Sequence, residues 1–156
     1  IYIILDNVLD TYNIGSIFRL ADAVAAEKVY LCGETLTPPN HRIKKASINT
    51  WQWVEWEYCE TAKKAIENCK LKIKNLRVVA VEQDPRSMPY TKPNPTLPVA
   101  IIVGNETYGV SKEALKMADQ IVELPMFGVN KSLNVMVSLG IVLYKAMQKV
   151  SGKLKA

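Results

Sequence analysis

The amino-acid sequence predicts an α/β fold with a mostly parallel sheet and helices on both faces. Short apolar runs, such as Lys28–Leu31 and Val99–Val103, alternate with segments whose apolar residues recur at helical spacing. This alternation is typical of parallel strands joined by crossover helices. The chain has 156 residues, 49% of them hydrophobic, so we expect a single domain, residues 1–156, with a buried core.

The first half begins with a strand, Tyr2–Leu5, and a polar loop up to Tyr12. Asn13 is a suitable cap for the first helix, whose apolar positions Ile14, Ile17 and Phe18 follow at helical spacing. Further along, the pattern predicts strands at 28–31, 54–58 and 77–82, a helix at 60–70, and a Pro-rich surface loop at 84–98.

The second half holds two apolar strands, Val99–Val103 and Ile121–Leu124, each followed by a Gly-containing loop and a helix. Helices are expected at 112–118 and from about 132 to 150, with Ser132 or Asn130 as the cap of the last one. In an open α/β sheet, ligands bind just outside the carboxyl ends of strands. These two loops are therefore expected to form walls of one pocket.

The loop Gly104–Ser111 has the spacing of a phosphate-binding P-loop, but Val110 stands where the lysine is needed. Glu106 would also repel a triphosphate, which disfavours a nucleotide hydrolase. A carboxylate among backbone N–H groups suits hydroxyls or a positively charged ligand better. The alternative is a plain strand-to-helix turn in which glycine supplies a positive φ.

Two other features each leave two interpretations open. Arg19 either forms a surface pair with Asp22 or directs its guanidinium to the carboxyl end of the first strand. The basic stretch 41–45 precedes three tryptophans at 51, 53 and 56. Basic and aromatic residues together suit RNA, which offers phosphates and stackable bases, but a solvated loop followed by packed tryptophans fits equally.

Composition narrows the classes of protein. The net charge of +5 is compatible with a polyanionic partner. The three cysteines form no C-x-x-C pair, which favours a reducing, cytoplasmic setting, and a single histidine disfavours a metal site or a Ser-His-Asp triad. No apolar run is long enough for a membrane span, so no membrane association is expected. The sequence contains no G-x-G-x-x-G fingerprint, so a nicotinamide cofactor is not indicated.

Three motifs in order resemble the SpoU branch of the SPOUT RNA methyltransferases, also called the TrmH family. They are Asn13-Ile-Gly-Ser-Ile-Phe-Arg19, Ile102-Val-Gly-Asn-Glu-Thr-Tyr-Gly-Val-Ser111, and Leu124-Pro-Met-Phe-Gly128 with Ser132-Leu-Asn-Val135. The resemblance spans nearly the whole chain. It implies transfer of a methyl group from S-adenosylmethionine to a ribose 2′-OH of tRNA or rRNA, without a metal. It also implies a C-terminal trefoil knot and a homodimer that packs through the first and last helices.

The resemblance implies residue roles as well. The active centre would comprise Asn13, Arg19, Glu106, Ser132 and Asn134. The cofactor would lie against Glu82, Gly104, Leu124, Met126, Ser132 and Leu133. Helix capping is the alternative for Ser132 and Asn134, and it is compatible with a role in the site. The RNA-binding extension of many relatives is not seen here, which leaves the choice of RNA open.

Arg19 is the proposed base in this family, but an arginine in a protein holds its proton firmly. We therefore favour a different role, in which Arg19 holds the phosphate beside the target ribose and stabilises the developing alkoxide. Two other functions stay open from the residues alone. One is a non-catalytic RNA-binding module on the same scaffold, and the other is a small-molecule α/β enzyme, which only the expected pocket supports.

Overall fold

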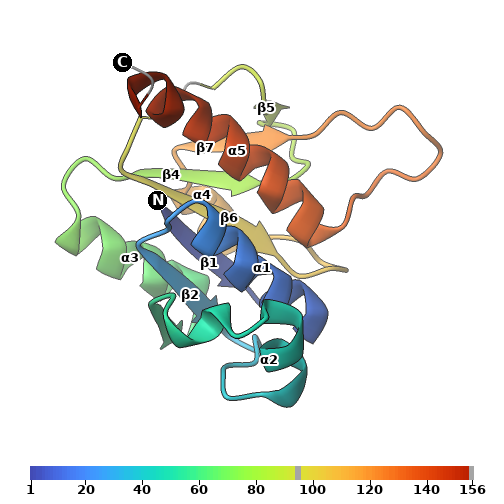
Figure 1. The fold of residues 1–156 in the computed structure, drawn as a ribbon. Coiled ribbons are helices and arrows are strands. Elements are labelled where there is room, and N and C mark those ends of the chain that lie inside the picture. The colour runs from blue at the N-terminus through green and yellow to red at the C-terminus, as the bar shows by residue number, and fades with distance from the viewer. Residues whose placement is uncertain (94–95, 155–156) are drawn as a thin grey trace.

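The protein is built on one seven-stranded sheet, seen in a computed structural model that describes residues 1–93 and 96–154 (Figure 1). The strand order is β3-β2-β1-β6-β4-β7-β5, and all pairs of neighbouring strands are parallel. The strands are β1 (Tyr2–Asp6), β2 (Lys28–Cys32), β3 (Trp56–Cys59), β4 (Arg77–Val81), β5 (Met88–Pro89), β6 (Val99–Gly104) and β7 (Gln120–Glu123). The expected parallel α/β architecture is confirmed.

Helices cover both faces of the sheet, as its alternating side chains require. They are α1 (Thr11–Ala23), α2 (His41–Ser47), α3 (Ala62–Lys72), α4 (Lys112–Met117) and α5 (Val135–Leu154), with a 3₁₀ turn, η1 (Thr50–Gln52). Ile3 and Leu5 of β1 join Phe18 of α1 in one core cluster, whereas Ile4 joins Ile66 of α3 in another. Helices α1, α2 and α5 therefore lie on one face, and α3 and α4 on the other.

The caps of two helices differ from the expectation. Asp10, not Asn13, caps α1, since its carboxylate accepts hydrogen bonds from the backbone N–H of Tyr12 (2.7 Å) and Asn13 (3.4 Å). Neither Ser132 nor Asn130 caps α5; Asn134 does, by accepting from the backbone of Met136 at 2.9 Å, which confirms the capping alternative given for Asn134. In both cases an aspartate or asparagine nearer the actual start of the helix takes the capping role.

Other differences concern segments with little periodicity. The stretch expected to be a basic loop forms α2, which Asn40 caps and Ile43 anchors in the core. The expected strand 54–58 starts later, at Trp56, and the loop expected at 84–98 contains the short edge strand β5. Of the two interpretations of Arg19, the surface pair with Asp22 is wrong: these two side chains form no ion pair, and Asp22 accepts a hydrogen bond from Trp53 Nε1 at 2.8 Å. Within the described residues, no helix is long and apolar enough to cross a membrane.

Candidate active site

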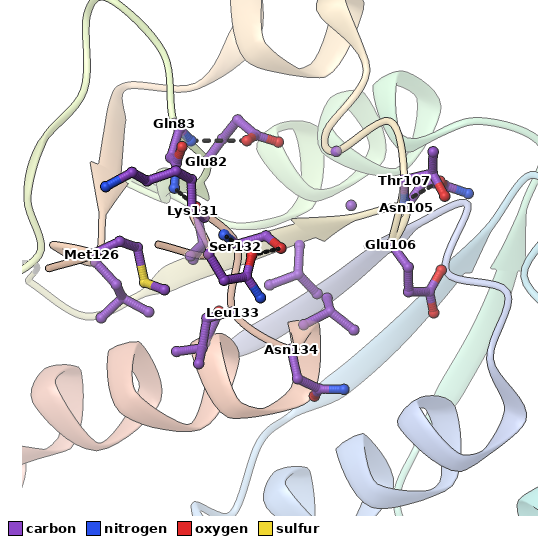
Figure 2. Close-up of a pocket in the computed structure, with 18 residues that line it drawn as sticks. Glu82, Gln83, Asn105, Glu106, Thr107, Met126, Lys131, Ser132, Leu133 and Asn134 are labelled. Atoms are coloured by element: carbon purple, nitrogen blue, oxygen red, sulfur yellow. Dashed lines mark hydrogen bonds between the residues drawn. The ribbon is translucent and has the colours of Figure 1, made fainter. Parts of the chain in front are cut away.

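A pocket of about 390 Å³ opens at the carboxyl ends of the central strands (Figure 2). Three segments contribute to its lining: residues 81–83 at the end of β4, residues 103–109 from the end of β6 into the next loop, and residues 124–138 from after β7 into α5. Because β6 lies between β1 and β4 in a parallel sheet, the loops that leave these strands meet at one edge. The pocket thus lies where such sheets bind ligands.

The loop after β6 is folded back tightly on itself. Gly104 has no room for a side chain, since a Cβ there would lie 2.1 Å from the backbone carbon of Gly109. Gly109 has a φ of +72° and lies against the carboxylate of Glu82. That carboxylate also accepts a hydrogen bond from the backbone N–H of Val110 at 2.8 Å. Gly104 therefore lets the two ends of the loop approach each other, and Gly109 lets the loop approach Glu82, the residue after β4.

Asn105 holds the same loop to the segment that follows β1. Its Nδ2 donates to the backbone oxygen of Asn7 at 2.9 Å, and its Oδ1 accepts from the backbone N–H of Thr107 (2.8 Å) and Tyr108 (3.0 Å). Both ends of the Asn105 amide are thus used, which fixes its orientation. The turn that presents Glu106 to the pocket is therefore held by the side chain of one of its own residues, Asn105.

Glu106 accepts hydrogen bonds from the segment before α1. Its Oε2 accepts from the backbone N–H of Leu9, and its Oε1 from that of Asp10, both at 3.0 Å. Asn13 Nδ2 adds a third bond at 3.1 Å. Partial burial raises the pKa of Glu106, but these donors outweigh burial and leave the pKa below its usual value. Glu106 is therefore ionised at neutral pH and acts as an acceptor.

Asn13 joins Glu106 to the start of α5. Its Oδ1 accepts a hydrogen bond from Asn134 Nδ2 at 3.1 Å, while its Nδ2 donates to Glu106. The Asn134 Oδ1 accepts hydrogen bonds from the backbone at the start of α5, which fixes the orientation of its amide and leaves Nδ2 to donate to Asn13. The three side chains, far apart in the sequence, form one continuous row of hydrogen bonds. We name Asn134, Asn13 and Glu106 the amide–carboxylate row.

The facing wall is the loop after β7, seen on the left of Figure 2. The side chain of Gln83 donates from its Nε2 to the backbone oxygen of Lys131, which ties this loop to the end of β4. Ser132 Oγ donates to Asn130 Oδ1 at 3.2 Å within the loop. Met126 and Leu133 add apolar surface to the lining.

Most residues that the sequence nominated for the site lie together. Eight of them line the pocket: Glu82, Gly104, Glu106, Leu124, Met126, Ser132, Leu133 and Asn134. Asn13 does not line it but holds two of the lining side chains through the amide–carboxylate row. Arg19 is different: it is exposed on α1, outside the pocket, and makes no ion pair or hydrogen bond through its side chain with the described residues.

Sequence reasoning missed several residues that build the site. Asp10 and Asn105 fix its frame, and Gln83 ties its two walls together. Asp10 carried a usable signal, because an aspartate three residues before a helical pattern is a favoured cap. Gln83 carried none, since a glutamine after a strand is as common on an open surface.

The lining suits a molecule of nucleoside size. Val81, Val103, Leu124 and Leu133 supply apolar walls, and the polar groups converge from the two loops. The volume falls in the range of about 300–1,000 Å³ that small-molecule sites occupy. Among residues 1–93 and 96–154, no group of three or more His, Cys, Asp or Glu side chains is placed to hold a metal ion.

Comparison with known proteins gives a consistent result. The model of the SpoU rRNA Methylase family matches residues 1–144. The tRNA (guanosine(18)-2′-O)-methyltransferase of Aquifex aeolicus is 32% identical over 148 residues, which cover 92% of this chain and 67% of that protein. The Escherichia coli enzyme of the same name is 28% identical, and the match covers 93% of this chain and 62% of that protein. The chain thus spans about two thirds of these relatives' length.

Solved structures share the fold. The A. aeolicus TrmH/SpoU tRNA modifying enzyme superposes with a TM-score of 0.86 at 28% identity, over 97% of this chain and 76% of that one. An AdoMet-bound rRNA methyltransferase from Sinorhizobium meliloti also has a TM-score of 0.86 at 28% identity, over 96% of this chain and 56% of that one. The latter structure contains the methyl donor.

Proposed function

Because the chain belongs to the SpoU rRNA Methylase family, we propose that it transfers a methyl group from S-adenosylmethionine to a ribose 2′-OH of tRNA or rRNA. The observation that carries this proposal is the amide–carboxylate row beside a pocket of nucleoside size. Relatives that act on tRNA and an AdoMet-bound structure of similar fold support it. The three sequence motifs meet at this one place.

S-adenosylmethionine supplies an electrophilic methyl group on a positively charged sulfur. We place this donor against Gly104, Leu124, Met126, Ser132 and Leu133, with Glu82 beside it. The tight backbone at Gly104 gives a flat surface, and the apolar side chains give a face for the adenine ring. Since the sulfonium already activates the methyl group, we propose no metal ion for this step.

The target ribose lies beside Glu106 in this proposal. An ionised carboxylate whose bonds come from Leu9, Asp10 and Asn13 is fixed in place and can accept a further hydrogen bond from a hydroxyl. The 2′-oxygen forms a bond to the methyl carbon as the carbon–sulfur bond breaks, and S-adenosylhomocysteine leaves. The 2′ proton passes to a neighbouring phosphate or to water.

Arg19 reaches a pocket only in a dimer, in our proposal. Its side chain is exposed on α1, whose Leu20 packs against α5 at Gly140. The two helices are in contact, and α5 also carries exposed apolar side chains. Those of α5 are Val137, Ile141 and Tyr144. Two copies that pack through this face would place Arg19 of one copy beside the pocket of the other, where it holds the phosphate.

Two further assignments belong to this proposal. We place the protein in the cytoplasm, which the three buried free thiols support: Cys32, Cys59 and Cys69. We also propose that the C-terminal part is threaded as a trefoil knot. Its support is that α5 packs against β4 and β6, while the segment before α5 is hydrogen-bonded to Gln83.

Two measurements test the activity. Calorimetry with S-adenosylmethionine should show binding at one site per chain, which a small-molecule enzyme of another class would not give. Labelled methyl groups should then pass to bulk tRNA or rRNA and survive in alkali-resistant dinucleotides, because a methylated 2′-oxygen blocks alkaline cleavage. Binding of the donor without any transfer to either RNA would favour the non-catalytic RNA-binding module instead.

A mixing experiment tests the place of Arg19. Arg19→Ala and Glu106→Ala should each be inactive alone. A mixed dimer of the two has one pocket with an intact Glu106 and an intact Arg19 from the other copy. Activity should therefore reappear after the two variants are unfolded and refolded together. If Arg19 acts within its own chain, both pockets of the mixed dimer are defective and no activity returns.

A further inference from the structure

A second hollow, of about 350 Å³, lies on α2 and the turn after it, away from the pocket. Its lining is His41, Lys44, Lys45, Ile48 and Asn49, and all five side chains are exposed. We name these residues, together with the exposed Arg42, the α2 surface. The sequence left RNA contact open for the basic stretch 41–45, and the site described under the proposed function does not use it.

The α2 surface carries positive charge that the chain does not neutralise. Between Thr35 and Val54 the sequence has no aspartate or glutamate, whereas Arg42, Lys44 and Lys45 are three of the chain's 20 lysines and arginines. None of the three forms an ion pair with the described residues, whereas Lys28, for example, pairs with Glu57. A group of exposed cations without acids favours a polyanionic ligand.

The turn beside these lysines is strained. Ile48 and Asn49 are consecutive non-glycine residues with positive φ, of 51° and 64°. A left-handed conformation is costly for a β-branched side chain, and Ile48 gains little from burial because it is 59% exposed. Buried neighbours hold the turn: Thr50 Oγ1 donates to the backbone oxygen of Ser47 at 2.8 Å. The core therefore fixes Ile48 in an exposed position next to the cations.

The α2 surface and the pocket share a common neighbour, α1. A Cβ on Gly15 would lie 2.5 Å from the Ala46 Cβ, so α1 and α2 are in direct contact there. Two residues earlier on the same helix, Asn13 belongs to the amide–carboxylate row. In the sheet, β2, the strand that precedes α2 in the chain, lies two strands from β6, so these two strands are roughly 10 Å apart. A ligand that extends over α1 can contact both places.

We propose that the α2 surface binds the sugar–phosphate backbone of the RNA substrate next to the nucleotide whose ribose enters the pocket. Arg42, Lys44 and Lys45 contact phosphates, and Ile48 contacts a sugar or base. This inference rests on the proposed function, since it concerns the same substrate. An acidic protein would match the charge alone, but it would not explain why one helix, α1, contacts both the α2 helix and the amide–carboxylate row.

The test removes two positive charges from the α2 surface and compares the effect with the removal of two positive charges elsewhere on the protein. Lys44→Gln/Lys45→Gln should raise the KM for RNA at least tenfold, with kcat and the Kd for S-adenosylmethionine unchanged. Plots of log affinity for RNA against log salt should become shallower by roughly 1.4, since each phosphate contact on a single strand contributes about 0.7. The matched control is Lys72→Gln/Lys74→Gln, two exposed lysines at the end of α3 on the other face of the sheet.

Ile48→Gly separates contact from folding. Glycine accepts a positive φ freely, so this variant should melt at the same or a higher temperature than the parent protein. It should nevertheless bind RNA several-fold more weakly if the side chain contacts the ligand. A purely structural role for Ile48 predicts that RNA binding stays unchanged.

The outcomes distinguish this inference from the proposed function. If the parent protein methylates RNA and the Lys44/Lys45 variant has the same KM and salt dependence, the inference is wrong and the function stands. Equal weakening in the Lys72/Lys74 control would also overturn it, because net charge alone would then explain the effect. If the parent protein transfers no methyl group at all, the proposed function fails. Direct RNA binding, followed by fluorescence anisotropy, still tests the surface.

Discussion

The two loops that form the pocket are held in different ways. In the loop after β6, residues 104–111, the side chains of Asn105 and Glu106 and the backbone N–H of Ser111 all bond to the segment 6–10. Apart from the bonds by which Asn134 caps α5, the loop after β7, residues 124–134, has two hydrogen bonds to other described parts of the chain. They come from Gln83 to Lys131 and from Asn134 to Asn13.

Exposure follows the same division. Phe127 and Val129 in the second loop are 94% and 99% exposed, and a Cβ on Gly128 would meet nothing within 4 Å. In the first loop, Gly104 and Gly109 are packed so closely that neither has room for a Cβ. One wall of the pocket, which we call the fixed wall, is therefore held by many contacts within the chain, while the tip of the second wall makes few. Glu106, which the proposed function sets beside the target ribose, lies on the fixed wall, as suits a group that must be held in place beforehand.

The largest expected effect comes from a glycine in the fixed wall. Gly104→Ala would place a Cβ 2.1 Å from the Gly109 backbone carbon and 2.2 Å from the Val110 nitrogen. Backbone must move to admit it, so we expect the free energy of unfolding to fall by about 3 kcal/mol, the upper end for overpacking. Urea denaturation measures this change.

Gly128→Ala is the matched control in the other wall. Its new methyl group would point into open space, so the change should stay within about 0.5 kcal/mol. Equal losses at the two glycines would show that the walls do not differ in the way described.

A smaller effect is expected at the joint between the two walls. Asn134→Ala removes the cap of α5 and leaves the Asn13 Oδ1 without its donor. Loss of such a cap costs about 1 kcal/mol, which thermal unfolding can detect. Ser132→Ala serves as a comparison, because Ser132 bonds only within its own loop and is exposed. If both variants unfold alike, the row does not join the walls energetically.

The strands and most helices were predictable because burial imposes a period on the sequence. The exceptions show what periodicity cannot supply. Helix α2 was missed since only Ile43 and Ser47 face inward, and two positions do not define a period. The cap of α1 was misplaced because Asp10 and Asn13 are both good capping residues. The contacts of the folded chain decide which one performs the task.

The site was predictable only in part, for a related reason. Spacing could place Glu106 on a loop at the end of a strand, but not beside Asn13, more than 90 residues earlier. That meeting depends on the strand order, which joins β1 to β6. The resemblance nominated the residues together, whereas the hydrogen bonds among them became visible only in three dimensions. Arg19 is a case that the sequence did not decide, because no pattern indicated that Trp53, rather than Arg19, would bond to Asp22.

The contribution of Glu106 in the fixed wall to the stability of the fold should depend on pH. The pKa of Glu106 in the folded chain lies below its ordinary value of 4.5, so its ionised form stabilises the fold. This contribution is fully present above pH 4.5 and is lost as the pH falls through the lowered pKa of the folded state. The stability difference between the parent protein and Glu106→Gln should therefore be constant from neutral pH down to about pH 5 and should shrink below it. A difference that persists unchanged at acid pH would contradict the role given to the backbone donors of Leu9 and Asp10.

The smallest effect on stability is expected in the second wall, where it is most informative. Phe127→Ala/Val129→Ala should leave the free energy of unfolding unchanged within about 0.5 kcal/mol, because both side chains are almost fully exposed in the free protein. The affinity for S-adenosylmethionine should nevertheless fall several-fold if this loop folds over the donor, since apolar surface is then covered only in the bound state. Urea denaturation and calorimetry of the same variant measure the two quantities. An affinity equal to that of the parent protein would mean that the loop stays open, and that the donor depends on the fixed wall alone.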